Sequence, residues 1–279
     1  MDLLEKINEC TDEELTSIID DALKMAIDNS EKKDRLGFTD GGLTTSKISA
    51  HKGFISPNTR IKYSNISMNL YSMKTKDYIY DFAKYIKKNK ITSKGYLVKI
   101  LENFINSYFG ISNGIDMRDE YFNKIAFQTT TTDDEYFEKL YNLEIGDLKG
   151  RNIALCTERA ALAQNLLSLF GFDVYYCIGC INNKGKEEAH CFNIARAKDS
   201  FILLDYSLPV SIIENGKAVD YAPFQGIIDI DELEDVLLNG INKDFPSYEY
   251  IKTSQDIKKV FTKELRTYSV GNLTFEKVI

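Results

Sequence analysis

Tryptophan is absent from the sequence, and proline and histidine are scarce. The 279 residues contain no Trp, four Pro and two His, so Phe and Tyr supply every aromatic side chain. The few prolines and the lack of a low-complexity block indicate a folded chain rather than extended disorder. A chain of this length can bury a substantial core without disulfides or a structural metal. One large domain, or a domain with an extension, is therefore expected.

Long apolar segments are also missing. No run approaches the length of a membrane-spanning helix. The first residues, MDLLEKINECTDEELTS, carry acidic side chains where a signal peptide needs a basic and then an apolar segment. Five cysteines, an odd number, suit a reducing compartment better than a disulfide framework. These features predict a cytoplasmic protein without a membrane partner. Export by a pathway that does not require a signal peptide is also compatible with them.

Positive charge is not in excess. The net charge is −7 and the isoelectric point is near 5.1, whereas binding to a nucleic-acid backbone needs clustered Lys and Arg. The one basic run, KYIKKNKITSK at residues 84–94, is interpreted as the solvated face and end of a helix. We therefore expect no nucleic-acid partner.

Helical patterns fill the first half of the chain. Residues 1–30 are predicted to be helical, with Thr11 and Glu14 as a capping box. The following residues, to about 74, are rich in Gly, Ser, Thr and Asn and are interpreted as irregular. Further helices are expected at 75–89, 92–110, 117–127 and from 129 to 143.

Strand patterns follow in the second half. A buried helix at 156–172, closed by Gly171, precedes strands at 173–181, 188–197 and 200–207, a hairpin around IIENGKAV, an acidic helix at 230–239 and a last strand near LRTYSVGN. Helices before strands predict an α+β fold with segregated layers. We expect an N-terminal helical arm and irregular segment over 1–74 and the main domain over 75–279.

Cys156 stands where the buried helix is expected to begin. Free backbone N–H groups and the helix dipole lower the pKa of a thiol at such a position, and the thiolate is the reactive form. The first backbone N–H could also stabilise an oxyanion during acyl transfer. The alternative is a buried structural cysteine.

A base and its orienting group lie downstream of this cysteine. His190 is on a predicted strand, and Asp205 ends the next strand, whereas His51 falls in the irregular segment and is interpreted as a surface residue. A two-residue loop at Ala197–Lys198 would place His190 directly opposite Asp205. A loop one position later would leave them diagonal on the same face, and a three-residue loop would separate them. We therefore predict a Cys156–His190–Asp205 triad.

The other cysteines suggest a weaker alternative. Cys191 is expected to face away from His190, because successive strand side chains point to opposite faces, and is interpreted as a small buried hydrophobe. CIGC, with Cys177 and Cys180, could form a zinc site only if the chain turned within this predicted strand. A thioredoxin-like redox pair needs a helix directly after it, and the sequence predicts a turn there. No metal and no cofactor are therefore expected.

The segment KGRNIALCTERAALAQNLLSLFGFDVYYCIGC, then AHCFNIA and FILLDYSLP, resembles the transglutaminase-like superfamily of cysteine enzymes. The shared pattern covers about residues 145–210. The resemblance implies a papain-like, transglutaminase-like core in which a Cys-bearing buried helix packs on an antiparallel sheet. It assigns nucleophile, general base and acid, and orienter to Cys156, His190 and Asp205. NIALC and Cys191 depart from the Gly before the Cys and the aromatic after the His that many members carry.

The resemblance implies amide or acyl chemistry through a thioester on Cys156. We expect a hydrolase of a protein or peptide; the alternatives are a cross-linking or deamidating acyltransferase of the transglutaminase type and a non-catalytic binding module. The family's oxyanion-stabilising side chain has only two candidates here, Asn152 and Gln128. Tyr206 is expected to line the substrate cleft or to cover the edge of the core.

Overall fold

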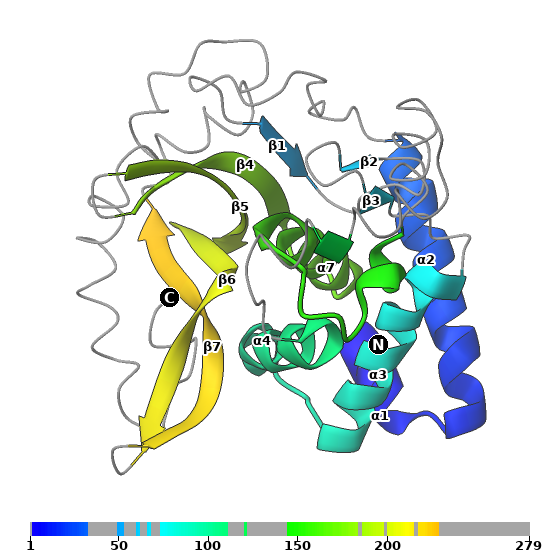
Figure 1. Ribbon diagram of the computed structural model, residues 1–279. Helices are drawn as coiled ribbons and strands as arrows, with labels where there is room; N and C mark the ends of the chain where they lie inside the picture. The colour runs from blue at the N-terminus through cyan, green and yellow to red at the C-terminus, as the bar shows by residue number, and fades with distance from the viewer. Residues whose placement is uncertain are drawn as a thin grey trace.

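A computed structural model of the chain describes residues 2–32, 49–52, 60–61, 66–67, 73–110, 120–121, 144–183, 186–197, 200–214 and 217–228. Within these residues, helices form one layer and a curved antiparallel sheet forms the other (Figure 1). The fold is therefore α+β, as the sequence predicts. None of the helices in this part of the chain combines the length and the apolar composition needed to cross a bilayer.

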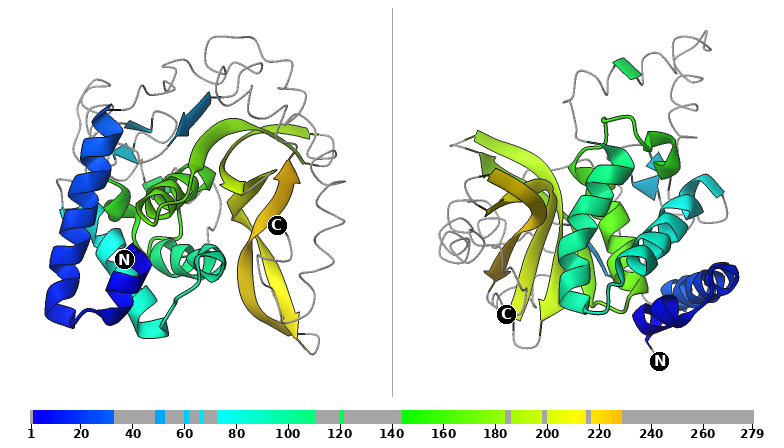
Figure 2. Two further views of the ribbon diagram at one scale, coloured as in Figure 1. Left: turned by 180° about the vertical axis from the view of Figure 1, so that it is seen from behind. Right: turned by 90° about the horizontal axis from the view of Figure 1, so that it is seen from below.

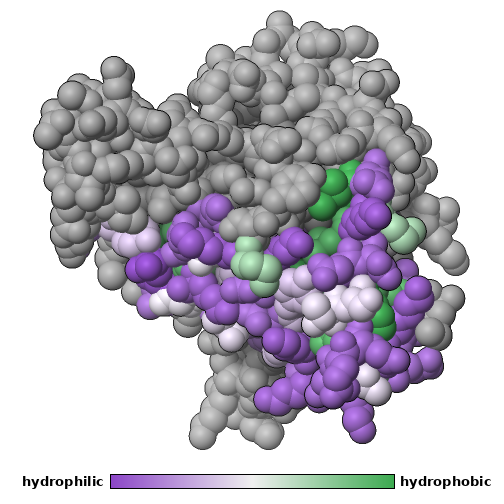
Figure 3. Space-filling view, turned by 90° about the vertical axis from the view of Figure 1, so that its right-hand side faces the viewer, coloured by the Kyte–Doolittle hydropathy of each residue, from purple (hydrophilic) through white to green (hydrophobic). Residues whose placement is uncertain are grey.

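The helical layer brings together segments that are distant in the sequence. Its elements are α1 (Leu3–Glu9), α2 (Asp12–Lys32), α3 (Met73–Asn89), α4 (Lys94–Phe109), the short 3-10 helix η1 (Ile145–Leu148) and α7 (Cys156–Leu169). α1 and α2 pack on α3, and α3 packs on α4. Both α4 and α7 lie against the sheet, α4 on β6 and β7 and α7 on β4, β5 and β6 (Figure 2). The described part of the face that α2 presents to solvent is mostly hydrophilic (Figure 3).

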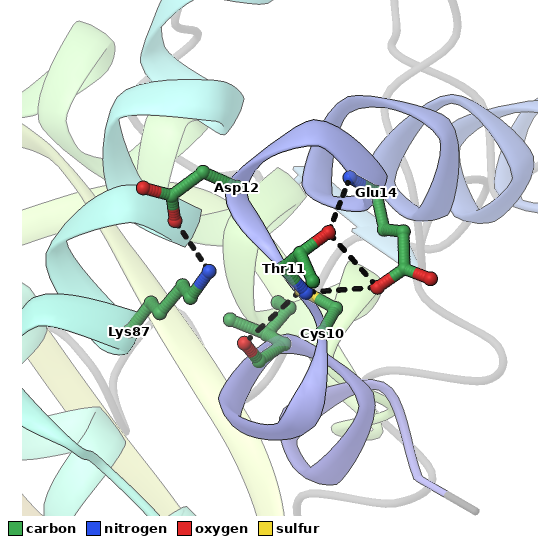
Figure 4. Close-up of polar contacts among 6 residues, drawn as sticks. Cys10, Thr11, Asp12, Glu14 and Lys87 are labelled. Atoms are coloured by element: carbon green, nitrogen blue, oxygen red, sulfur yellow. Dashed lines mark hydrogen bonds and ion pairs between the residues drawn. The ribbon is translucent and has the colours of Figure 1, made fainter.

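The predicted capping box marks the break between α1 and α2. The Thr11 backbone N–H donates to a Glu14 carboxylate oxygen at 2.8 Å, and the Glu14 N–H donates to the Thr11 hydroxyl at 3.3 Å (Figure 4). Each bond satisfies an N–H that has no partner within the helix. An ion pair between Asp12 and Lys87 then ties the start of α2 to α3. The capping box is confirmed.

Aromatic side chains fill the space between the helices. Phe82 of α3 lies 4.8 Å from Phe104 of α4 and 5.8 Å from Phe170 at the end of α7, measured between ring centroids. All three are buried, and burying one such ring contributes about 1.5–3 kcal/mol. The absence of Trp therefore does not prevent an aromatic core, because Phe supplies it.

The main sheet is a meander with one added strand. Its strands, in spatial order, are β1 (Ser49–Lys52), β4 (Val174–Asn183), β5 (Lys186–Ala197), β6 (Ser200–Glu214) and β7 (Lys217–Ile228), and each neighbouring pair is antiparallel. Glu214 pairs with Lys217 across an Asn-Gly dipeptide, a strong signal for a two-residue hairpin. The hairpin expected around IIENGKAV is confirmed.

The register between β5 and β6 corrects one prediction. Ala197 pairs with Ser200, so residues 198 and 199 separate the two strands. The register that would set His190 directly opposite Asp205 is wrong, because Ala197 remains in the ladder as the partner of Ser200. The two residues are instead diagonal on one face, the alternative that the sequence left open.

Strand β6 contains an irregularity just after Asp205. Asp205 pairs with Phe224 and Val210 pairs with Ala222, so β6 has extra residues between its two ladders. Pro209 and Pro223 both fall at this irregularity. Proline has no N–H to donate to a ladder, and it is therefore tolerated at bulges. The bulge interrupts the β6–β7 ladder directly after Asp205.

The N-terminal segment contributes to the same sheet and core as the rest of the chain. β1 pairs with β4 in the main sheet, and α1 and α2 pack on α3. β2 (Arg60–Ile61) and β3 (Ile66–Ser67) form a separate two-stranded sheet. The expectation that residues 31–74 are irregular is therefore wrong for these strands, since pairing within the fold overrode weak local propensity. The elements predicted at 129–143, at 230–239 and near LRTYSVGN, and most of 117–127, lie outside the described residues.

Candidate active site

Cys156 is the first residue of α7, as the sequence predicts. Leu155 has extended backbone angles and is the N-cap, and the first helical bond runs from Arg159 N–H to Leu155 O at 3.2 Å. The Leu155 N–H donates to the Glu158 carboxylate at 2.8 Å, which fixes the entry of the chain into the helix. The N–H groups of the first turn are therefore directed toward the cysteine end of the helix, where they favour negative charge.

Buried hydrogen bonds hold the first turn of α7 in place. The Arg159 guanidinium donates to Asn106 Oδ1 at 2.7 Å and to Gly110 O at 2.5 Å, both at the end of α4, and to Ala154 O at 3.3 Å. Only 4% of the Arg159 surface is exposed. This one side chain therefore joins α4 to the segment that leads into Cys156.

A second buried cluster joins α7 to the sheet. Asn193 of β5 donates to Ala160 O and to Gln164 Oε1, both at 3.1 Å, and Gln164 donates to Val174 O at 2.9 Å. Neither Asn193 nor Gln164 is exposed. These buried hydrogen bonds hold α7 in a fixed position on β4 and β5. They set the distance between Cys156 and the residues of β5.

His190 and Asp205 contact each other across the β5–β6 pair. His190 Nε2 lies 2.6 Å from Asp205 Oδ2, with side-chain exposures of 12% and 4%. The His190 ring also stacks on the Phe192 ring, with centroids 6.3 Å apart. Asp205 occupies one ring nitrogen, so the other nitrogen, Nδ1, remains for the thiol.

Ser207 fixes the orientation of Asp205. Its backbone N–H and its hydroxyl donate to Asp205 Oδ1 at 2.9 and 2.6 Å, and the same hydroxyl lies 3.3 Å from His190 Nε2. With Oδ1 held in this way, Oδ2 is directed at the imidazole. Sequence reasoning missed Ser207, although an Asp followed two positions later by Ser is the pattern of a local side chain-to-backbone turn.

The Cys156 thiol contacts two neighbours on β5. The largest influence on it is a hydrogen bond with the Cys191 thiol, which lowers the pKa of Cys156; burial raises that pKa, and the hydrogen bond and charge of His190 lower it again. The net result is a pKa well below the usual value for a cysteine. Cys156 is half-buried, whereas Cys191 is buried.

Cys191 is buried, as predicted, but it is more than a core residue. Its thiol lies 3.6 Å from the Thr157 hydroxyl and contacts both Cys156 and the Tyr176 hydroxyl. The interpretation of Cys191 as a plain hydrophobe therefore needs correction. Strand alternation alone gives no signal for this contact, since it concerns only which side chains share a face.

The strand edge explains how one thiol reaches two consecutive residues that point to opposite faces. The described pairing of β5 with β6 ends at Asn193 and Leu204, whereas β5 continues to pair with β4 beyond His190. The edge of β5 beside His190 and Cys191 is thus open to the start of α7. The Cys191 backbone N–H donates to Cys156 there, so the sulfur lies beside the strand.

The charges at the site favour an ion pair. Burial lowers the pKa of His190, but the charge and hydrogen bond of Asp205 outweigh it and raise that pKa to about 10. Burial raises the pKa of Asp205, but the charge and hydrogen bond of His190 outweigh burial and hold the pKa of Asp205 below its usual value. The directions of these shifts together favour the ionised forms of the three groups: a Cys156 thiolate, a His190 imidazolium and an Asp205 carboxylate.

The remaining predicted residues have different positions. Tyr206 is 1% exposed and donates to Val98 O of α4 at 3.3 Å, which supports the core alternative over the cleft. Asn152 lies against Gly110, and its backbone N–H donates to Phe109 O at 2.9 Å, at the end of α4; Gln128 is outside the described residues. The oxyanion role of both stays a prediction.

The CIGC segment lies in β4 rather than in a turn. Cys177 is fully buried, burial raises the pKa of its thiol, and it pairs with Phe192 in the ladder. The side chain of Cys180 is outside the described set. Within the part of the chain that the structure describes, no group of three or more His, Cys, Asp or Glu side chains could hold a metal ion.

No protein-family model matches the chain. No curated protein sequence matches it either.

Proposed function

We propose that this chain is a cysteine-dependent acyl-transfer enzyme with a papain-like, transglutaminase-like core, and that it hydrolyses amide bonds in a protein or peptide. The observation that supports this most strongly is the linear set of contacts from Cys156 to His190 to a buried Asp205. A thiol nucleophile, a base within reach and a third group that orients the base are the parts that covalent acyl transfer needs.

Acylation would begin from the thiolate. The Cys156 sulfur attacks the substrate carbonyl and forms a tetrahedral intermediate. His190, already protonated by virtue of its raised pKa, donates its Nδ1 proton to the leaving amine, and a thioester remains on Cys156. Asp205 holds the imidazole in the orientation that directs Nδ1 at the reacting atoms.

The start of α7 would stabilise the negative charge of the intermediate. The Cys156 N–H lies in the first helical turn, before the first bond of the helix ladder. Such an N–H is directed along the helix axis toward the bound carbonyl oxygen, and one oxyanion donor typically changes kcat by about 10²–10³-fold.

The acyl acceptor decides the overall reaction. After the amine leaves, neutral His190 can take a proton from water, and attack of that water on the thioester releases a carboxylate. Attack by an amine in place of water would give a cross-linked product. Among the described residues, no observation favours an amine acceptor, so hydrolysis is the simpler proposal.

Acylation can be tested without knowledge of the substrate. We expect p-nitrophenyl acetate to acetylate Cys156 in a stoichiometric burst, followed by slower turnover, because a generic activated ester needs only the nucleophile. Cys156→Ala should abolish the burst. Cys177→Ala, which removes a buried thiol from the neighbouring strand, should leave it unchanged. Equal bursts in the wild type and Cys156→Ala would refute the proposal.

The acceptor can be identified in a second experiment. A tryptic digest of a whole cell lysate, supplied with a biotinylated alkylamine, offers water and an amine as competing acceptors. We expect mass spectrometry to find new carboxyl termini that depend on Cys156. Biotinylated glutamine side chains would instead indicate a transferase. If the folded protein gives neither product and also shows no ester burst, the result would indicate a binding module.

A further inference from the structure

Two thiols lie side by side at the candidate site, at the start of α7 and on β5. The side chains of Cys156 and Cys191 share a hydrogen bond, and the hydroxyl of Thr157, the residue next to Cys156, lies 3.6 Å from the Cys191 sulfur. Both cysteines are free. Acyl transfer uses only the first thiol, so the position of the second needs a separate explanation.

The two thiols differ in access to solvent. Cys156 is partly exposed, whereas Cys191 is only 2% exposed and is enclosed by Tyr176 and Thr157. Cys156 is the more exposed of the two residues, so it is the first to meet a small oxidant. Cys191 can react only with a group that is already on Cys156.

We propose that Cys156 and Cys191 form a reversible disulfide when the protein meets hydrogen peroxide or another hydroperoxide. In the first step, the Cys156 thiolate attacks a peroxide oxygen, the O–O bond breaks, and the departing hydroxide takes a proton to become water. Cys156 is then a sulfenic acid, its sulfur oxidised by two electrons.

In the second step, the Cys191 sulfur attacks the Cys156 sulfur. The S–O bond breaks, the S–S bond forms, and the hydroxide leaves with the proton from Cys191 as a second water. One peroxide and two thiols thus give one disulfide and two waters. A dithiol reductant reverses the change, whereas further oxidation of Cys156 to a sulfinic acid would not be reversible in this way.

The electrostatics of the pair favour this order of events. The hydrogen bond with Cys156 is the largest cause that raises the pKa of Cys191, followed by burial and then by the charge of Cys156. Oxidation of Cys156 removes that negative charge. The loss of the thiolate makes Cys191 easier to deprotonate at the moment when it is needed as a nucleophile.

The disulfide would protect and silence the site. It occupies the Cys156 sulfur, so the proposed acyl-transfer reaction stops until the bond is reduced. The disulfide itself does not depend on that reaction, since it needs only the two adjacent thiols and an oxidant. Redox chemistry and acyl transfer can therefore fail independently.

The test uses the full chain in its native state. The protein is treated with a small molar excess of hydrogen peroxide, its remaining thiols are blocked with iodoacetamide in denaturant, and peptides are identified by mass spectrometry before and after reduction. We expect the Cys156 and Cys191 peptides to be lost together and recovered as one cross-linked pair. Tris(2-carboxyethyl)phosphine should restore both.

Two variants make the outcome specific. In Cys191→Ser the disulfide cannot form, so dimedone should label a sulfenic acid on Cys156. Cys177→Ser removes an equally buried thiol from β4 and should still form the Cys156–Cys191 bond. Oxidation of wild-type Cys156 to sulfinic acid with Cys191 still alkylatable would overturn the proposal, even if Cys191→Ser fails to fold. An ester burst without the disulfide would overturn only the redox inference. Formation of the disulfide without an ester burst would overturn only the proposed acyl transfer.

Discussion

Replacing Asp205 with Asn should change the protonation of His190 while keeping the shape of the side chain. Burial lowers the pKa of His190, and the two strongest opposing influences, a charge and a hydrogen bond, both come from Asp205. Without the charge, the pKa should fall from about 10 toward the ordinary value of 6.5. At pH 8 an imidazole with a pKa of about 10 is about 99% protonated, and one with a pKa of 6.5 is about 3% protonated. The imidazolium population of His190 should therefore fall by up to about thirtyfold.

The scarcity of histidine makes this change directly measurable. The chain contains only His51 and His190, so a ¹H–¹³C correlation spectrum of the imidazole Cε1 positions shows two signals. One signal in the wild type should stay in the imidazolium position until the pH approaches 10, and in Asp205→Asn it should titrate several units lower. Asp147→Asn, which removes a carboxylate paired with Lys74, controls for lost negative charge. Two ordinary titrations in the wild type, or no shift in Asp205→Asn, would refute the reasoning.

Three further predictions concern the residues that support the site. Burial raises the pKa of Glu102 to about 8, so between pH 4.5 and 8 the folded state retains a proton that the unfolded state loses, and stability falls as pH rises. Thermal unfolding of Glu102→Gln should match the wild type at pH 4 and show a higher Tm at pH 9; parallel pH profiles would contradict this. Asn193→Ala removes two buried hydrogen bonds, those to Ala160 O and to Gln164 Oε1, and should cost about 1–3 kcal/mol in urea unfolding, while Asn89→Ala, at an exposed amide, should cost little. Ser207→Ala removes the 2.6 Å bond to Asp205 but keeps the backbone bond, so the acetylation burst should slow by about twofold to tenfold and recover in Ser207→Thr; an unchanged rate would remove Ser207 from the account.

Local sequence signals predicted most of the described elements. The capping box of Thr11 and Glu14, the helix end at Gly171, and the Asn-Gly hairpin each depend on contacts within a few residues, and the structure confirms all three. The contact of His190 with Asp205 also followed from one local quantity, the number of residues between two strands. Strand alternation then made both side chains share a face.

Features that depend on distant contacts were beyond the sequence. β1 exists because β4 offers it an edge, and nothing in SAHK itself predicts a strand. Tyr206 is buried because α4 covers it. The contact of Cys191 with Cys156 depends on where the β5–β6 ladder ends, and the bulge after Asp205 that accompanies this end is marked only by the prolines at 209 and 223.

The two neighbours of Cys156 have separable effects. Cys191 supplies the largest pKa-lowering contact of the thiol, and His190 supplies the next. Removal of either side chain alone should therefore leave part of the reactivity of Cys156. The two effects are separate because the Cys156 sulfur lies at the edge of β5, where it contacts both His190 and Cys191.

The most direct test of the central claim is the alkylation rate of each cysteine at pH 6. An ordinary thiol of pKa about 8.5 is only about 0.3% thiolate at that pH, whereas Cys156 is held well below its usual pKa. We predict that iodoacetamide modifies Cys156 at least about tenfold faster than Cys10, which is also partly exposed, and that His190→Ala slows this reaction. Equal rates at Cys156 and Cys10 in the native protein would contradict the thiolate–imidazolium pair on which the account depends.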